Sequence, residues 1–185
     1  MIIGVTGYAR SGKSTVCDML HREFGFTVVG FADTLKRAAV AADPIVCCDE
    51  STLAGVVEAE GWEDAKDLYP EVRAFLQRFG TAARETFGPD VWVDAWQRRV
   101  NQLAADGISD IAVPDLRYLN EAARIRSHFD AAIWRVTRPN VGPQSNHPSE
   151  TEQDHIHSNV EIHNSGDLDH LLREVINTAD GWDRE

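Results

Sequence analysis

The stretch Gly7-Tyr8-Ala9-Arg10-Ser11-Gly12-Lys13-Ser14 matches the pattern G-x-x-x-x-G-K-[ST], and Thr15 follows it. The apolar run 2–6 comes directly before the motif, and a helical pattern begins at residue 15. A strand, a glycine-rich turn and a helix in this order form a P-loop, in which backbone N–H groups converge on a phosphate. We therefore predict a nucleoside triphosphate site made of Ala9, Arg10, Ser11, Gly12, Lys13, Ser14 and Thr15.

Two side chains of this loop carry its chemistry. Lys13 is predicted to reach the β- and γ-phosphates of ATP as a catalytic residue, and the Ser14 hydroxyl is predicted to ligate Mg²⁺. We expect Lys13 to be exposed to solvent in the empty site, so its replacement should leave the fold intact.

The rest of the chain alternates between strand and helix patterns. Strands are expected at residues 2–6, 27–31, 110–114, 131–137 and 159–163, and helices at 15–24, 33–42, 118–129 and 167–178. Because strands separated by helices are joined by right-handed crossovers, this pattern predicts a parallel sheet with helices on its faces. The expected fold class is α/β, a three-layer P-loop NTPase fold with a five-stranded parallel sheet.

Two segments interrupt this alternation within a single domain, whose core comprises residues 1–43 and 108–185. Residues 44–107 show only helical patterns, including an apolar face of Val72, Phe75, Leu76 and Phe79 that ends at Gly80, so we expect a helical insertion. Residues 138–157 are rich in Pro, Asn, Ser and Gly and lack periodicity, which is typical of a functional lid loop.

The composition argues against several classes of protein. The 185-residue chain has a formal net charge of −12, which disfavours nucleic acids and anionic membranes as partners because they attract basic surfaces. No apolar run approaches the ~20 residues of a membrane-spanning helix. Residues 1–7 lack the basic start of a signal peptide, so we expect a cytoplasmic protein. Cys17, Cys47 and Cys48 are expected to be small buried apolar side chains rather than a disulfide framework.

Two aspartates follow expected strands, at the sheet edge where α/β proteins bind ligands. Asp115 is expected to hold Mg²⁺, directly or through water, and the alternative is a loop residue or a helix N-cap. Arg117 would point into the same cleft. Asp33 is a helix N-cap, part of the acceptor site, or both, and Lys36 and Arg37 on the following helix would face an acceptor that carries phosphate.

Three further arginines are candidates for phosphate binding. Arg78 and Arg84 flank Phe79 in the helical insertion and suggest a pocket that stacks a base and holds a phosphate, although each could be an ordinary surface arginine. Arg138 begins the lid at the carboxyl end of the fourth strand. From there, a closing lid could neutralise charge on a transferred phosphoryl group.

On these residues, the chain resembles the bacteriophage deoxynucleoside monophosphate kinases, a branch of the P-loop nucleoside monophosphate kinase superfamily. The matching segments span nearly the whole chain in order: residues 7–15, Phe31-Ala32-Asp33-Thr34-Leu35-Lys36, Leu76-Gln77-Arg78-Phe79-Gly80-Thr81 with Arg84, Val113-Pro114-Asp115-Leu116-Arg117-Tyr118-Leu119-Asn120-Glu121-Ala122, and Arg138 with His147-Pro148-Ser149-Glu150. The lid departs from the arginine-dense lids of adenylate kinases, because no Arg or Lys lies between Arg138 and Arg173.

The resemblance implies ATP with Mg²⁺ as the donor and a (deoxy)nucleoside monophosphate as the acceptor, giving dNDP and ADP for DNA synthesis, in the host cytoplasm if the chain is phage-encoded. It implies that the helical insertion binds the acceptor, with Lys36 and Arg78 on its phosphate. Arg117 and Arg138, as catalytic residues, and the region of Ser149 and Glu150 would close over the site. Glu150 is therefore counted among the acceptor-binding residues.

Two other functions compete with this one. A P-loop kinase with a hydroxyl acceptor, such as dephospho-CoA kinase, shares the superfamily and an aspartate at the Asp33 position, and it would need a carboxylate base. A P-loop binding or switch module without transfer activity is the third, although the helical insertion and the many arginines argue against it. The base preference and the oligomeric state stay open, and a homodimer is one option.

Overall fold

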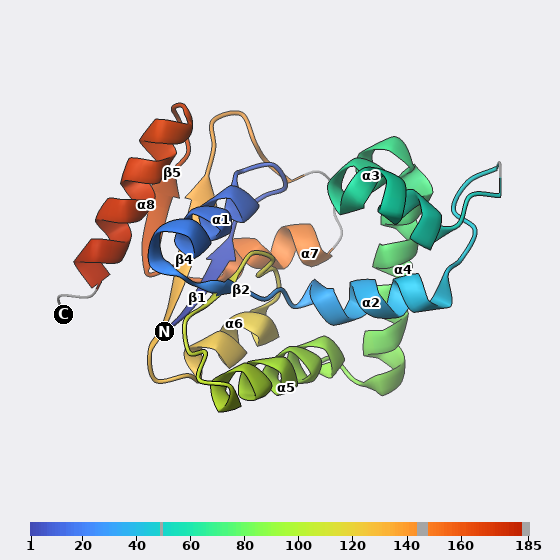
Figure 1. The fold of residues 1–185 in the computed structure, drawn as a ribbon, viewed down its shortest axis with the longest axis horizontal. Coiled ribbons are helices and arrows are strands. Elements are labelled where there is room, and N and C mark those ends of the chain that lie inside the picture. Colours follow the sequence, from blue (N-terminus) through green and yellow to red (C-terminus); the bar gives the residue numbers. More distant parts are fainter. Residues whose placement is uncertain (49, 144–147, 183–185) are drawn as a thin grey trace. The chain divides into compact units, whose positions relative to one another are not determined.

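The computed structural model describes residues 1–48, 50–143 and 148–182, except for the side chain of Ser149 (Figure 1). They belong to two compact units, one made of Met1–Phe31 with Gln97–Glu185 and the other of Ala32–Trp96. We call these the sheet unit and the helical unit. The borders of the helical part predicted from the sequence lie at residues 44 and 107 instead.

The sheet unit contains five parallel strands in the order β2-β3-β1-β4-β5. The strands are β1 Ile2–Thr6, β2 Thr27–Val28, β3 Ile111–Val113, β4 Ala131–Thr137 and β5 Val160–His163. Every residue of β1 is buried, as expected for a central strand of a parallel sheet. The predicted α/β fold with five parallel strands is confirmed.

Helices cover both faces of this sheet (Figure 1). They are α1 Lys13–Phe24, α6 Leu119–Arg126 and α8 Leu168–Trp182. Ile3 and Val5 of β1 share a buried core with side chains of α1 and α8. Gly4 lies between them and faces the opposite way, because a Cβ built on it would lie 2.5 Å from the Ile125 side chain of α6. The three layers predicted from the sequence are therefore present.

The helical unit comprises α2 Ala32–Ala42, α3 Leu53–Leu68, α4 Pro70–Phe87 and the start of α5, Val91–Ala105. The predicted face of α4 packs into a core around Ala39, Leu53 and Val72. The predicted helix end at Gly80 is wrong, because α4 continues to Phe87. Gly80 is buried there, and a Cβ on it would lie 2.7 Å from the Leu35 side chain. Gly80 therefore allows α4 to pack closely against α2 and does not form a turn.

The predicted lid, residues 138–157, is only partly a loop. Its second half folds as the one-turn helix α7, Pro148–Thr151, and the 3₁₀ helix η1, Glu152–His155. Glu150, Gln153 and Ile156 are buried. The prediction that this half is a loop is wrong, because helices this short leave too few residues for a periodic pattern. Residues 144–147, including His147, lie outside the described residues.

Outside the lid, the predicted and the observed helices and strands differ most in where they end. β2 spans two residues where five were predicted, although the Val29 N–H still donates to the Ala112 carbonyl (2.9 Å). The helix predicted for 118–129 ends at Arg126, and Phe129 is fully exposed. Among the described residues, no helix combines the length and apolar character that a bilayer-crossing segment needs.

The three cysteines differ in burial, which corrects the expectation that all are buried. Cys17 is buried in the sheet unit, where burial raises its pKa, whereas Cys47 is half-buried and Cys48 is exposed. Thiolates are the reactive form. We therefore expect iodoacetamide to modify Cys48 in the native protein and to modify Cys17 only after unfolding, as read by peptide mass spectrometry. Modification of Cys17 in the native protein at the rate of Cys48 would contradict this.

Candidate active site

The P-loop connects β1 to α1 in the sheet unit. Its backbone has positive φ angles at Gly7 (140°), Arg10 (66°) and Gly12 (110°), and the Ser11 N–H donates to the Tyr8 carbonyl (3.2 Å). The first-turn N–H groups of any helix lack intrahelical acceptors, and the helix dipole adds positive potential at that end. The start of α1 at Lys13 is thus suited to bind an anion.

Both glycines of the motif are required by close contacts. A Cβ on Gly7 would lie 2.3 Å from the Val136 carbonyl oxygen, and one on Gly12 would lie 2.6 Å from Nδ2 of Asn164. The same Nδ2 donates to the Ser11 carbonyl (2.9 Å), so Asn164 holds the loop against the end of β5. Asn164 was not predicted as a site residue, although its place directly after the last strand could have indicated it.

Lys13 is buried, with 8% of its surface exposed, which corrects the expectation that it faces solvent. Its Nζ donates to the carbonyls of Gly7 and Tyr8, both at 2.7 Å. Burial and the nearby positive charge of Arg117 lower the pKa of Lys13 to about 8, whereas Glu150 and Asp115 oppose this shift. An arriving phosphate would supply the negative charge that favours the ammonium form.

Asp115 lies at the carboxyl end of the sheet, as predicted. Its Oδ1 accepts a hydrogen bond from the Phe31 N–H (2.9 Å), and Gly30 gives the carboxylate room, because a Cβ there would lie 2.7 Å from Oδ2. The Asp115 charge adds to the effect of burial in raising the pKa of Cys17, and it opposes the lowering of the Lys13 pKa by burial and Arg117. The alternative that Asp115 caps α6 is wrong, because the cap is Tyr118.

Arg117 is held at both ends by buried carboxylates. Its backbone N–H donates to Oε2 of Glu121 (2.9 Å), and its Nη1 donates to Oε1 of Glu150 (2.7 Å). Arg117 and Glu150 therefore lie together in the sheet unit. Arg138 follows β4 and is exposed, and its Nη1 lies 3.5 Å from the Arg10 carbonyl of the P-loop. The structure thus brings both predicted catalytic arginines to the P-loop side of the sheet unit.

The remaining predicted acceptor residues belong to the helical unit. Asp33 is exposed in the first turn of α2, and the Arg37 Nη2 donates to the hydroxyl of Thr34 on the same helix (3.3 Å). The Lys36 ammonium lies 5.6 Å from the centre of the Trp62 ring. This geometry fits a cation–π contact. Trp62 was not predicted as a site residue.

On α4, Arg78 is exposed, whereas Arg84 donates to the Pro89 carbonyl (3.4 Å). Phe79 stacks on Phe75 with ring centres 5.6 Å apart and also contacts Trp92. Phe79 is thus part of the aromatic side of the helical core. Of the two arginines, Arg78 is the more accessible to a ligand phosphate.

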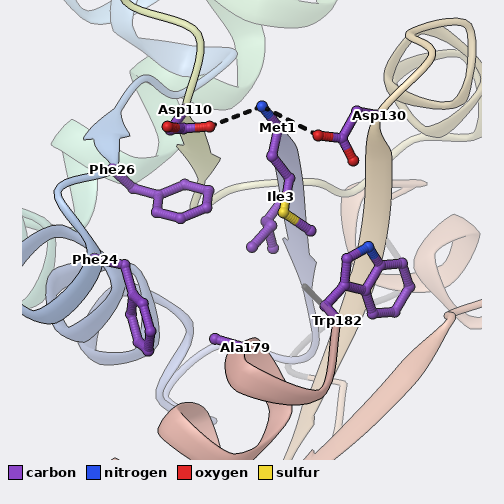
Figure 2. Close-up of a pocket in the computed structure, with 8 residues that line it drawn as sticks. All are labelled: Met1, Ile3, Phe24, Phe26, Asp110, Asp130, Ala179 and Trp182. Carbon is purple, nitrogen blue, oxygen red and sulfur yellow. Dashed lines mark hydrogen bonds and ion pairs between the residues drawn. The ribbon is translucent and has the colours of Figure 1, made fainter. Parts of the chain in front are cut away.

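A separate cavity of about 370 Å³ lies at the amino ends of the strands (Figure 2). The Met1 amine lies between the carboxylates of Asp110 (2.8 Å) and Asp130 (3.5 Å), and the rings of Phe24, Phe26 and Trp182 surround the apolar part. Ligands of open α/β sheets bind at the carboxyl ends of the strands. This cavity is therefore distinct from the P-loop site.

No family model matches the chain. A curated relative, the "Putative deoxynucleotide monophosphate kinase" of Acanthamoeba polyphaga mimivirus, is 23% identical and covers 97% of this chain and 96% of its own length. The full-length likeness and the P-loop support a P-loop kinase.

Solved structures with related folds include a "putative kinase" from Chloroflexus aurantiacus J-10-fl (13% identity, 97% of this chain and 96% of that chain, TM-score 0.49). A second is shikimate kinase from Aquifex aeolicus VF5 (11% identity, 98% and 97%, TM-score 0.48). At these identities and TM-scores they say nothing about the acceptor.

Proposed function

We propose that this protein is a deoxynucleoside monophosphate kinase that transfers the γ-phosphate of ATP to a dNMP, giving dNDP and ADP. The observation that carries the proposal is the P-loop with its buried lysine, next to Asp115 and Arg117 at the carboxyl edge of the sheet. The full-length likeness to the mimivirus protein supports a nucleoside monophosphate as the acceptor.

The chemistry requires positioning and positive charge rather than a base. A phosphate monoester has a second pKa near ~6, so the acceptor oxygen is already anionic at neutral pH. Lys13 and the N–H groups of the P-loop would hold the β- and γ-phosphates, while Arg117 and Arg138 would neutralise charge that develops during transfer. Lys36 and Arg78 would bind the acceptor phosphate, with Asp33, Arg37, Phe79 and Arg84 as further acceptor-side candidates.

The residues present fit Mg²⁺. The Ser14 hydroxyl is exposed at the start of α1, and Asp115 provides a carboxylate near the same helix end. Hydroxyl and carboxylate oxygens are the ligands that this cation prefers. When bound, Mg²⁺ would neutralise charge on the β- and γ-phosphate oxygens.

A panel of acceptors tests the proposed function. ADP release is measured with ATP–Mg²⁺ and each NMP and dNMP, with dephospho-CoA as a hydroxyl acceptor and with no acceptor. We expect turnover with at least one dNMP well above the rate without acceptor. Turnover with dephospho-CoA alone would assign the hydroxyl-acceptor function, and ATP binding without any transfer would indicate a binding module.

Asp33→Asn separates the two kinase functions. The substitution keeps the size of the side chain and removes its charge and its ability to accept a proton. With a phosphate acceptor, we expect a loss of less than about tenfold in kcat, because no proton must be removed. A loss of ~10²–10⁴-fold, together with disappearance of the acidic limb of the pH–rate profile, would instead indicate a hydroxyl acceptor.

Arg78→Ala and Arg138→Ala are expected to affect different kinetic constants. Arg78 is proposed to hold the acceptor phosphate equally in the ground and transition states, so its loss should raise the KM for the dNMP. Arg138 is proposed to act on charge that develops during transfer, so its loss should lower kcat. Steady-state kinetics with both substrates varied provides the measurement, and a raised KM for ATP alone in both variants would contradict both assignments.

A further inference from the structure

The segment 148–157 is fastened to the sheet unit at several points. Arg135 of β4 donates through Nη2 to the carbonyls of Gln153 (2.8 Å) and Ile156 (2.6 Å). The Tyr8 hydroxyl, inside the P-loop, donates to Oδ1 of Asp154 (2.6 Å), and the Leu119 N–H donates to Oε2 of Glu152 (3.2 Å). These hydrogen bonds join the segment to β4, to the P-loop and to the start of α6.

Glu150 is one of the side chains that this segment directs inward. Only 8% of the Glu150 side chain is exposed, and its Oε1 accepts the 2.7 Å bond from Arg117. The buried side chain of Gln153 donates to the Glu150 carbonyl (3.2 Å), which fixes the backbone of α7. A buried carboxylate that already accepts from an arginine is unsuited to bind the phosphate of an acceptor, because like charges repel.

Arg117 is the group that Glu150 fixes. The Arg117 side chain is 32% exposed, so it remains open to a ligand, and its charge adds to the effect of burial in lowering the pKa of Lys13. The Glu121 carboxylate holds the Arg117 backbone, while Glu150 holds the guanidinium. A long side chain gains catalytic value when its conformation is set in advance, because its ordering no longer has to occur with each substrate.

We propose that Glu150 is a positioning residue, which holds the Arg117 guanidinium on the P-loop side of the sheet unit, and that residues 148–157 form the support from which it does so. The proposal rests on the proposed phosphoryl transfer and changes the assignment of Glu150 from acceptor binding to orientation of Arg117. It also predicts that Arg117 and Glu150 act as one unit, so that the effect of replacing Glu150 depends on Arg117.

A double-mutant cycle tests this dependence. The variants are Glu150→Gln, Arg117→Met and the double variant, with Glu161→Gln as a matched control that removes the same charge from an exposed position on β5. Glu150→Gln is expected to lower kcat by ~10–100-fold, because Arg117 loses its orientation. The KM for ATP should stay the same or fall, because a negative charge near the phosphate site is removed.

The cycle also identifies how Glu150 acts. In the Arg117→Met background, Glu150→Gln should change kcat by less than about threefold, because the group that it orients is gone. An equal loss with and without Arg117 would mean that Glu150 contacts the substrate, and would overturn the proposal. Activity of Glu150→Gln equal to that of Glu161→Gln would overturn it as well.

A binding measurement separates this proposal from the proposed function. If the wild-type protein transfers phosphate to none of the acceptors, the proposed function fails, and the same cycle is then measured on the Kd for ATP by calorimetry. A change of Kd on Glu150→Gln that differs in size between the wild-type and Arg117→Met backgrounds would still support orientation of Arg117 by Glu150, because independent effects would be additive. An equal change of Kd in both backgrounds would reject it.

Discussion

Lys13→Met is expected to lower kcat by at least ~10²–10³-fold, the size of loss usual for one preorganised charge at a reacting group. Methionine keeps most of the buried volume of the lysine side chain and removes the ammonium, which in the free protein donates to the Gly7 and Tyr8 carbonyls. Because Lys13 is buried, folding must be checked by circular dichroism and thermal unfolding.

Arg22→Met is the matched control, because it removes one positive charge from an exposed position in the last turn of the same helix. It should keep near-normal kcat. If Lys13→Met also kept near-normal turnover while remaining folded, the proposal of phosphoryl transfer at this P-loop would be abandoned.

The pH dependence of ATP binding provides a second measurement on Lys13. Its pKa of about 8 means that the free protein loses the ammonium proton as the pH rises through 8, whereas bound phosphate favours the ammonium form. The affinity for ATP should therefore fall above pH 8, with proton uptake on binding near that pH. Calorimetry in buffers of different ionisation enthalpy detects this uptake, and an affinity that stays constant to pH 9.5 would contradict it.

Gly7→Ala is expected to destabilise the protein by about 3 kcal/mol or more. Gly7 has φ 140°, which disfavours any residue with a side chain, and the added Cβ would lie 2.3 Å from the Val136 carbonyl oxygen. That oxygen belongs to the backbone of β4, so relief requires movement of either the strand or the loop. Urea unfolding followed by circular dichroism measures the loss, and turnover should fall with it.

Gly25→Ala is the matched control, which separates the cost of the contact with Val136 from the cost of the positive φ angle. Gly25 also has positive φ (76°), at the end of α1, but a Cβ there would meet nothing within 4 Å. Its replacement should therefore cost only the strain of the left-handed conformation, about 1 kcal/mol. Equal losses for Gly7→Ala and Gly25→Ala would show that the close approach to Val136 contributes nothing.

Most of the sheet unit could be predicted because its signals are local. A buried strand, a P-loop and a helix follow one another within residues 2–24, and β4 has the bounds that its apolar run indicates. The end of β2 and the presence of α7 could not be predicted in the same way. β2 ends after two of the five residues predicted for it, and α7 has only four residues, which is too few for a repeating pattern.

Gly80 and Lys13 show why local patterns also mislead. A glycine after an apolar helical face usually marks a helix end, but at Gly80 the missing side chain makes room for Leu35, which lies far away in the sequence. A lysine is usually exposed, but Lys13 folds back onto carbonyls of its own loop. In both cases a neighbour in space overrides the usual preference of the residue.

The sequence by itself determined the phosphate loop, the alternation of strands and helices and the parallel sheet, because glycine spacing and hydrophobic period act over a few neighbouring residues. The tertiary structure alone decided which side chains meet. Glu150 lies 33 residues from Arg117, and Asn164 lies 153 residues from Ser11, yet each forms a hydrogen bond with that partner. Such contacts depend on how the crossovers bring strand ends together, and a local pattern contains no information about which residues far apart in the sequence become neighbours in space.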